Sequence, residues 1–195
     1  MPLILTDVDD TLLCWSDAFT RWVVARGYQP AGSLIEVYRI HEWLGVGVDH
    51  ALGLVAEFQQ DEENFSTLEA YPGAQDGVAR LVAAGYRLVA ITACGQDPRL
   101  SDWRYRNLHA LFGPVFDGLV LVPLNGSKAQ KLTDYTPTWW IEDNFNHAVT
   151  GVRCGHRSLL LDYPHNRRQH AKVERVQSWG EITDLILDNR IGPSP

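Results

Sequence analysis

Cysteines and long apolar runs are both scarce in this sequence. The three cysteines, Cys14, Cys94 and Cys154, are odd in number, widely spaced and free of any C-x-x-C pattern. This argues against a disulfide framework or a zinc site, and we expect all three to be small buried hydrophobic residues. No run of 18 apolar residues occurs, and the N-terminus lacks a basic stretch leading into an apolar signal segment. We therefore expect no membrane span and a cytoplasmic location.

Positive charge is also in short supply. The chain has 17 Lys and Arg against 24 Asp and Glu, which gives a formal net charge of −7 and argues against sequence-independent binding of nucleic acid. One stretch departs from this balance, because six basic residues lie between positions 151 and 176: Arg153, Arg157, Arg167, Arg168, Lys172 and Arg175. We interpret them as a solvated surface, with contact to a phosphate-bearing ligand as the alternative.

The size of the chain, 195 residues, and its composition, 45% hydrophobic and 21% charged, are those of a globular protein. Short apolar runs typical of strands buried on both faces recur along it: Leu3–Leu5, Leu88–Ile91, Leu119–Val122, Trp139–Ile141 and Leu159–Leu161. Helical patterns lie between them, such as Val78, Leu81 and Val82, and a capping box of Ser178 and Glu181. This alternation predicts an α/β fold with a Rossmann-like, doubly wound parallel sheet.

One interval breaks this alternation. Residues 17–70 contain no convincing buried strand, and their helical patterns are rich in aromatic residues: Phe19, Trp22, Tyr38, Trp43, Phe58 and Phe65. A connection this long inside a compact domain is usually functional, so we interpret it as an inserted small helical cap. The core domain is then expected to comprise residues 1–16 and 71–195, and the chain re-enters it at the "YPGAQ" turn of residues 71–75.

Three carboxylates follow the first predicted strand at once. In "LTDVDDTL", Asp7, Asp9 and Asp10 concentrate negative charge at the end of a buried strand, which indicates a nearby cation. A calcium loop would need glycine and glutamate where Leu12 and Ala18 stand, so that alternative fails. Capping of a following helix would account for one carboxylate but not for three.

A second acidic pair ends another predicted strand. Glu142 and Asp143 follow "TWWI", and ligands of open α/β sheets lie beyond the carboxyl ends of strands. If the two strands are neighbours, Asp7 and Asp143 meet around one hard cation, and oxygen ligands suit Mg²⁺. Two residues then fit a bound phosphate: Thr92, which ends the strand "LVAI", and Lys128, which an S-x-x-Q capping pattern places in the first turn of a helix.

Taken in order, these segments resemble the four motifs of the haloacid dehalogenase-like (HAD) hydrolase superfamily. The matching segments are "LTDVDDTL", "AIT", "SKAQKL" and "IEDN", and together they extend across the whole chain. The aromatic insertion falls between the first and second motifs, where the C1-type caps of the family fall. Within the superfamily, "YPGAQ", the E-D pair and "DYPHN" are most similar to nucleotide 5′-phosphatases and to phage or bacterial relatives.

The resemblance assigns roles to the acidic residues. Asp7 is expected to be the nucleophile that attacks phosphorus and forms an aspartyl-phosphate. Asp9 is expected to be the general acid and then the general base, and an acid at this position distinguishes phosphatases and mutases from the dehalogenase branch. The resemblance also implies that Mg²⁺ is held by the carboxylates of Asp7 and Asp143 and by the backbone carbonyl of Asp9.

The remaining motif residues are expected to act around this centre. Thr92 and Lys128 would hold the phosphoryl oxygens, with Lys131 as the alternative lysine. Glu142 departs from the more usual Asp, and we expect it to orient Lys128 or a metal-bound water while leaving a direct role in metal binding open.

Four further residues are candidate substrate contacts: Thr11, Trp15, Phe19 and Trp22. The three aromatic side chains could stack on a nucleobase, or they could form the core of the cap. We expect a Mg²⁺-dependent phosphomonoesterase acting on a small phosphorylated metabolite, with a nucleoside 5′-monophosphate as the favoured substrate. The alternatives are a polynucleotide 3′-phosphatase that uses the basic stretch, and a non-catalytic metal- or partner-binding module. The oligomeric state stays open.

Overall fold

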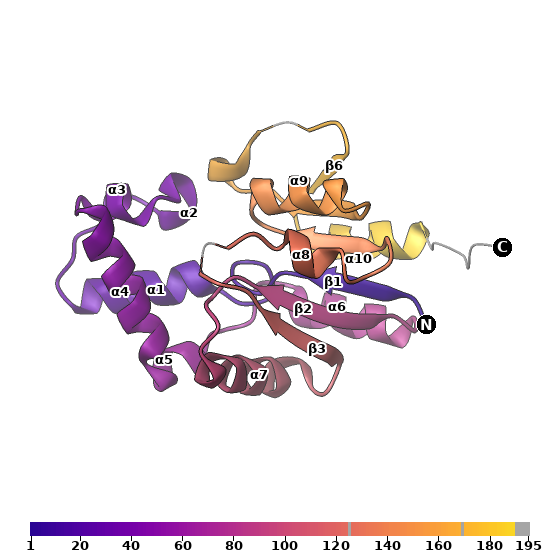
Figure 1. Ribbon diagram of the computed structural model, residues 1–195, viewed down its shortest axis with the longest axis horizontal. Coiled ribbons are helices and arrows are strands. Elements are labelled where there is room, and N and C mark those ends of the chain that lie inside the picture. The colour runs from indigo at the N-terminus through magenta and orange to yellow at the C-terminus, as the bar shows by residue number, and fades with distance from the viewer. Residues whose placement is uncertain (125, 169, 190–195) are drawn as a thin grey trace.

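A parallel sheet forms the centre of the molecule (Figure 1). The computed structural model describes residues 1–124, 126–168 and 170–189, and within them six strands pair in the order β3-β2-β1-β4-β5-β6. The strands are β1 (Leu3–Thr6), β2 (Arg87–Thr92), β3 (Phe116–Leu121), β4 (Trp139–Glu142), β5 (Arg157–Leu161) and β6 (Val173–Val176). Strand order reverses between β1 and β4, so the sheet is doubly wound. The predicted α/β fold class is confirmed.

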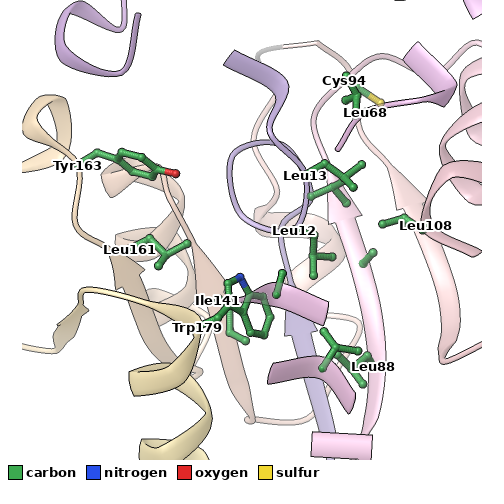
Figure 2. Close-up of a cluster of buried hydrophobic side chains, with 14 of the residues drawn as sticks. Leu12, Leu13, Leu68, Leu88, Cys94, Leu108, Ile141, Leu161, Tyr163 and Trp179 are labelled. Atoms are coloured by element: carbon green, nitrogen blue, oxygen red, sulfur yellow. The ribbon is translucent and has the colours of Figure 1, made fainter. Parts of the chain in front are cut away.

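Helices cover both faces of this sheet. One face carries α6 (Ala74–Ala83), α7 (Pro98–Phe112) and α10 (Trp179–Asp188), and the other carries α8 (Ala129–Leu132) and α9 (Phe145–Arg153). Successive residues of β1 therefore enter different clusters, because Ile4 joins the larger core whereas Leu5 packs with Trp140. Figure 2 shows part of the larger core, to which both Trp179 of α10 and Ile141 of β4 belong.

Between β1 and α6, the fully described segment 7–73 forms five helices that extend away from the sheet (Figure 1). They are α1 (Trp15–Ala25), α2 (Leu34–Val37), α3 (Ile40–Leu44), α4 (Val48–Gln60) and α5 (Glu62–Ser66). The ring centroid of Phe19 lies 5.4 Å from that of Phe58 and 5.9 Å from that of Trp22. These rings give the helices a hydrophobic centre that is continuous with the larger core.

The domain boundaries expected from the sequence can be compared with these elements. The first helix of the insertion begins at Trp15, slightly before the expected start of the cap at residue 17. The core segment expected at 71–195 includes residues 125, 169 and 190–195, which lie outside the described residues. Helix α10 begins as expected, because the Ser178 hydroxyl accepts the Glu181 N–H at 3.2 Å.

Two features of the elements differ from the expectation. Strand β6 is absent from the predicted strands, because Glu174 and Arg175 interrupt its apolar pattern at the edge of the sheet. Val82 was expected on the apolar face of its helix, but it is 36% exposed. Sequence periodicity therefore located the other five strands but not the edge strand β6.

Two further expectations concern the burial of the cysteines and the absence of a membrane span. The three cysteines are free, and burial holds for Cys94 only, because Cys14 and Cys154 lie at helix ends and are partly exposed. Within the described residues, no helix combines the length and the apolar character needed to cross a membrane.

Two helical glycines give a matched test of the core packing. A Cβ on Gly151 of α9 would stand 2.6 Å from Ser158 Oγ and would clash with Trp140, whereas a Cβ on Gly53 of α4 would meet no atom within 4 Å. We expect G151A to lower the free energy of unfolding by about 1–3 kcal/mol through overpacking, and G53A to raise it by about 0.5–1 kcal/mol. Urea denaturation followed by circular dichroism measures both, and a G151A protein as stable as the parent would contradict the close packing of α9 on the sheet.

Candidate active site

The predicted motif residues lie together at the carboxyl ends of the strands. Thr6 of β1 pairs with Ile141 of β4, and the Asp7 N–H donates to the Ile141 carbonyl at 2.8 Å. Asp143 follows the end of β4. Strand β2 lies on the other side of β1 and ends at Thr92. The three side chains therefore lie beyond the carboxyl ends of adjacent strands, where the strand order reverses and α/β proteins bind ligands.

Three buried carboxylates form a candidate metal site at these strand ends. One oxygen from each of Asp7, Glu142 and Asp143 lies within 4.8 Å of the others, and the residues are 5%, 0% and 7% exposed. Like charges this close are unfavourable without a cation between them, and hard oxygen donors suit Mg²⁺. The residues present therefore fit the metal predicted from the sequence, and they bring Glu142 into the same group as the two expected ligands.

One lysine offsets part of this charge. Lys128 immediately precedes α8 and is 1% exposed; its ammonium contacts the Asp7 carboxylate and donates to Glu142 Oε1 at 2.7 Å. It stands at the cap position of the helix, one residue earlier than the capping pattern predicts. Lys131, the alternative lysine, has an exposed side chain that lies 3.8 Å from Asp134. Of the two lysines, Lys128 is the one beside the carboxylates.

Glu142 is held by the protein through both of its oxygens. Oε1 accepts from Lys128, and Oε2 accepts the backbone N–H groups of Asp143 at 2.7 Å and Asn144 at 2.8 Å. Burial opposes the ionisation of Glu142, but the Lys128 ammonium, the nearby His147 and the two backbone N–H donors together outweigh it and lower the pKa of this carboxyl. Glu142 is thus a buried anion that fixes the position of Lys128 and of the turn after β4.

Burial and mutual repulsion act on the other two acids. Burial and the charge on Glu142 raise the pKa of Asp7 to about 7, against the opposing effect of Lys128. Burial, with the charges of Glu142 and Asp7, raises the pKa of Asp143 well above its usual value. Burial disfavours the charge on Lys128, but Asp7 and Glu142 outweigh this and raise its pKa. When all three acids are ionised, the cluster carries more negative charge than one ammonium offsets, and a divalent cation would favour that ionised state.

Asp9 is bound by a different set of side chains. Thr92 Oγ1 donates to Asp9 Oδ2 at 3.1 Å, and Arg104 of α7 donates through Nη2 to Asp9 Oδ1 at 2.6 Å. Arg104 is completely buried, whereas the Asp9 side chain is 24% exposed. Arg104 is absent from the residues predicted from the sequence, because an arginine inside a helix and outside the motifs carries no local signal of its partner.

The third carboxylate of the first motif orders the start of the insertion. Asp10 has a left-handed backbone with φ of 55°, and it accepts the Ser16 N–H at 2.8 Å as well as the Ser16 hydroxyl. Burial raises the pKa of Asp10 to about 7, although the bonds from Ser16 oppose this. The Tyr163 hydroxyl donates to the Asp10 carbonyl at 2.8 Å. Asp10 therefore connects β1, α1 and the loop after β5.

A cavity of about 340 Å³ lies between these residues and the insertion. Asp7, Asp9, Lys128 and Asp143 line its inner end. The wall formed by the insertion includes the apolar residues Trp15, Leu34, Ile40, Val48, Ala51, Leu52 and Val55, together with the polar residues Ser16, Tyr38, Arg39, His41 and Gln59. The cavity therefore combines a charged floor with a partly apolar wall, the arrangement that binds a ligand with one anionic end.

The candidate substrate residues are placed differently from one another. Trp15 lines the cavity. Phe19 and Trp22 do not, and with exposures of 0% and 5% they belong to the hydrophobic packing of the insertion, which was the alternative interpretation. Thr11 is also fully buried outside the cavity lining, and its carbonyl accepts the Trp179 indole N–H at 2.7 Å. In this structure Phe19, Trp22 and Thr11 do not line the cavity, so the cavity gives no support to their expected contact with the substrate.

The insertion is held over the site by an aromatic contact that the sequence did not indicate. Tyr38, which has φ of 65°, stacks on His165 of the short helix η1 (Pro164–Asn166) with ring centroids 4.4 Å apart. Its hydroxyl accepts a hydrogen bond from the Asn144 side chain, and His165 Nδ1 lies 2.7 Å from the Ile35 carbonyl. These contacts join α2 to the loops that follow β4 and β5.

Comparison of sequences gives a distant relative. No protein-family model matches the chain. An uncharacterised 32.4 kDa protein of Enterobacteria phage T4 is 24% identical, in an alignment that covers 95% of this chain and 70% of the phage protein.

Solved structures give a broader likeness. A D,D-heptose 1,7-bisphosphate phosphatase from B. bronchiseptica, complexed with magnesium and phosphate, is 15% identical over 96% of this chain and 99% of its own, with a TM-score of 0.61. A predicted phosphatase from Clostridium acetobutylicum is 16% identical over 96% and 98%, with a TM-score of 0.66. A haloacid dehalogenase-like family hydrolase from Streptococcus pneumoniae is 15% identical over 95% and 98%, with a TM-score of 0.65. At these identities the likeness shows the fold alone, so the chain shares the α/β fold of these three proteins.

Proposed function

We propose that the protein is a Mg²⁺-dependent phosphomonoesterase that works through an aspartyl-phosphate. The observation that carries this proposal is the buried group of Asp7, Glu142 and Asp143, with Lys128 among them, beside a cavity that Asp7, Lys128 and Asp143 line. Carboxylates that repel one another beside an ammonium form a site for a cation and a phosphate together. The order of the four motifs along the chain and the HAD fold support the same reaction.

Asp7 is the nucleophile in this mechanism. One of its carboxylate oxygens forms a bond to phosphorus while the bond from phosphorus to the leaving oxygen breaks. Asp7, Asp143 and the backbone carbonyl of Asp9 would hold Mg²⁺, which supplies the positive charge that reduces repulsion between the nucleophile and a phosphate dianion. Lys128 directs its ammonium at the same carboxylate, so it can hold a phosphoryl oxygen that approaches Asp7.

Asp9 transfers the protons. In the first step it gives a proton to the leaving oxygen, and in the second it takes a proton from the water that attacks phosphorus and releases Asp7 with inorganic phosphate. The Thr92 hydroxyl, which donates to Asp9 Oδ2, lies at the strand end where it can also meet a phosphoryl oxygen. Asp7 and Asp9 thereby divide nucleophilic and proton-transfer work between two neighbouring side chains.

A nucleoside 5′-monophosphate is the substrate that we favour. Much of the cavity wall is apolar, and Trp15 supplies an aromatic ring on which a base can stack. Gln59 of α4 lines the same cavity, is 6% exposed, and makes no side-chain hydrogen bond within the described part of the chain. A buried carboxamide without a partner offers a donor and an acceptor to a ligand.

The polynucleotide alternative receives less support from the basic stretch. Arg167 and Arg175 both pair with Asp162, at 3.1 and 2.8 Å, and Arg168 lies over the Phe145 ring. Side chains held by such contacts present less free charge to a phosphate backbone than the sequence alone indicates.

Phosphate release from a panel of substrates tests the proposed function directly. Nucleoside monophosphates, sugar phosphates and 3′-phosphorylated oligonucleotides would be compared with and without Mg²⁺. We expect turnover that needs Mg²⁺ and is fastest with nucleoside 5′-monophosphates. A strong response to sugar phosphates alone would overturn the substrate class, and steep salt dependence on oligonucleotides would favour the polynucleotide alternative. No release from any compound would favour a non-catalytic module.

Replacement of the nucleophile tests the chemistry. Asp7→Asn keeps the size of the side chain but removes the attacking oxygen anion, so we expect kcat to fall by more than about 10²-fold. Asp184→Asn, at an exposed position paired with Arg80, is the matched control and should retain the parental rate. An Asp7→Asn protein with more than about one per cent of that rate would exclude Asp7 as the nucleophile.

Metal binding has a readout that needs no turnover. At 100 times its dissociation constant, Mg²⁺ should stabilise the folded protein by about 2.7 kcal/mol, because it binds the native carboxylate cluster. Asp143→Asn should remove most of this Mg²⁺-dependent stabilisation, while the Asp184→Asn control keeps it. Thermal unfolding at constant ionic strength measures the difference, and equal Mg²⁺ effects in the Asp143→Asn protein and the parent would place the metal elsewhere.

The carboxamide in the cavity gives a test of substrate recognition. We expect Gln59→Leu to lower kcat/KM for the preferred nucleotide by about 3–10-fold, the usual worth of one hydrogen bond. Hydrolysis of p-nitrophenyl phosphate should change little, since that compound lacks a nucleobase. Gln60→Leu, at the next and exposed position of α4, is the control. If the two variants behave alike toward the nucleotide, Gln59 does not contact the substrate.

A further inference from the structure

Arg104 is a buried cation whose setting the proposed chemistry leaves unexplained. Its residue exposure is 0%, and it lies on α7, outside all four motifs. Nη2 donates to Asp9 Oδ1 at 2.6 Å, while Nε and Nη1 are buried without a hydrogen-bond partner among the described residues. A charged guanidinium with two unpaired nitrogens is costly to bury. Buried charged groups of this kind are found mainly at functional sites.

We propose that Arg104 is the positioning residue of Asp9, fixing its carboxylate for proton transfer and linking it to the insertion. This inference rests on the proposed phosphatase function and deepens it. Two observations of different kinds carry it: the ion pair with Asp9, and the contact of the same guanidinium with the insertion.

The ion pair leaves the Asp9 side chain little rotational freedom. Arg104 binds one carboxylate oxygen, and the Thr92 hydroxyl binds the other at 3.1 Å. A charge-assisted hydrogen bond is stronger than a neutral one and is directional, because the guanidinium is planar. With both oxygens held, Asp9 stays at the cavity wall in one orientation, and that preorganisation is what an acid acting on a leaving oxygen needs.

The second contact reaches the insertion. The guanidinium carbon of Arg104 lies 3.9 Å from the centroid of the Phe65 ring on α5, and Phe65 is completely buried. A guanidinium over an aromatic face is favourable, and more so where water is excluded. Arg104 is therefore held between the ring of a cap helix and the carboxylate of the first motif, so the position of α5 bears on the orientation of Asp9.

A neighbouring arginine provides the matched control. Arg106 lies two positions after Arg104 on the same helix. It also connects α7 to α5, through an ion pair with Glu62. That pair is about half exposed on both sides and does not involve Asp9. Loss of Arg106 removes a link between the two helices but leaves the Asp9 carboxylate bound, so it separates general support of the insertion from the specific role of Arg104.

A double-mutant cycle tests the inference. The four proteins are the parent, Arg104→Met, Asp9→Asn and the double variant, assayed on the preferred nucleotide and on p-nitrophenyl phosphate, whose leaving group needs little protonation. We expect Arg104→Met to lower kcat about 10–10²-fold on the nucleotide, a part of what general acid catalysis supplies. The loss on p-nitrophenyl phosphate and the change in KM should be small. In the Asp9→Asn background, Arg104→Met should lower kcat no further, since the group it positions is gone.

The controls keep the outcome interpretable. Arg106→Met should retain the parental kcat on both substrates. Arg104→Lys keeps the charge but loses the planar fork, so it should recover part of the rate lost in Arg104→Met. It also serves as the test variant if Arg104→Met does not fold, as judged by circular dichroism.

Three results would reject the inference. They are equal losses on the two substrates, losses that multiply in the double variant, and an Arg106→Met protein as impaired as Arg104→Met. Each would mean that Arg104 supports the structure generally. A parent protein without any turnover would reject the proposed function and this inference together, whereas an active parent with an unimpaired Arg104→Met would reject the role of Arg104 alone.

Discussion

The structure depends on holding several like charges in a small buried volume. Asp7, Glu142 and Asp143 place carboxylate oxygens within 4.8 Å of one another, and Lys128 offsets only part of their charge. Buried carboxylates in such a group weaken the fold unless a cation compensates them, so this arrangement is better explained by binding than by stability. Burial and the repulsion between these carboxylates also raise the pKa values of Asp7 and Asp143.

The order of the strands is what makes this concentration of charge achievable. Because β1 pairs directly with β4, the residues after Thr6 and Ile141 are neighbours in space although more than a hundred positions separate them in the chain. The connection from β3 to β4 then passes through α8, and Lys128 enters the cluster from its start. Parallel strands direct all their carboxyl ends to one edge, so a few side chains from separate motifs suffice to build the site.

The sequence predicted the parts of this arrangement that follow from local patterns. Apolar runs located the central strands, and acidic residues at two strand ends indicated where the site lies. Edge strand β6 escaped, since Glu174 and Arg175 lie within it. Arg104 and Gln59 escaped for another reason: each is one polar residue in an ordinary helix, and its importance comes only from what the tertiary fold places beside it. Aromatic composition likewise could not distinguish Phe19, which is buried in the packing, from a ring that lines the cavity.

The insertion contacts the rest of the protein at a loop after β4 and at helix α7. Through Tyr38 it binds Asn144 in the turn after β4, and through Phe65 it contacts the guanidinium of Arg104, which in turn holds Asp9. Tyr38 and Asn144 line the cavity, and so does Asp9, the partner of Arg104. In the proposed enzyme, a leaving group that fills the cavity therefore packs against the helices of the insertion. The same helices contact Arg104, which orients Asp9, and the turn after β4, which carries Asp143. Binding energy from the part of the substrate remote from phosphorus can in this way be used for catalysis as well as for selection. A densely packed aromatic layer couples substrate binding to the orientation of these residues better than an open loop would, because a rigid element passes on a displacement that a flexible one absorbs.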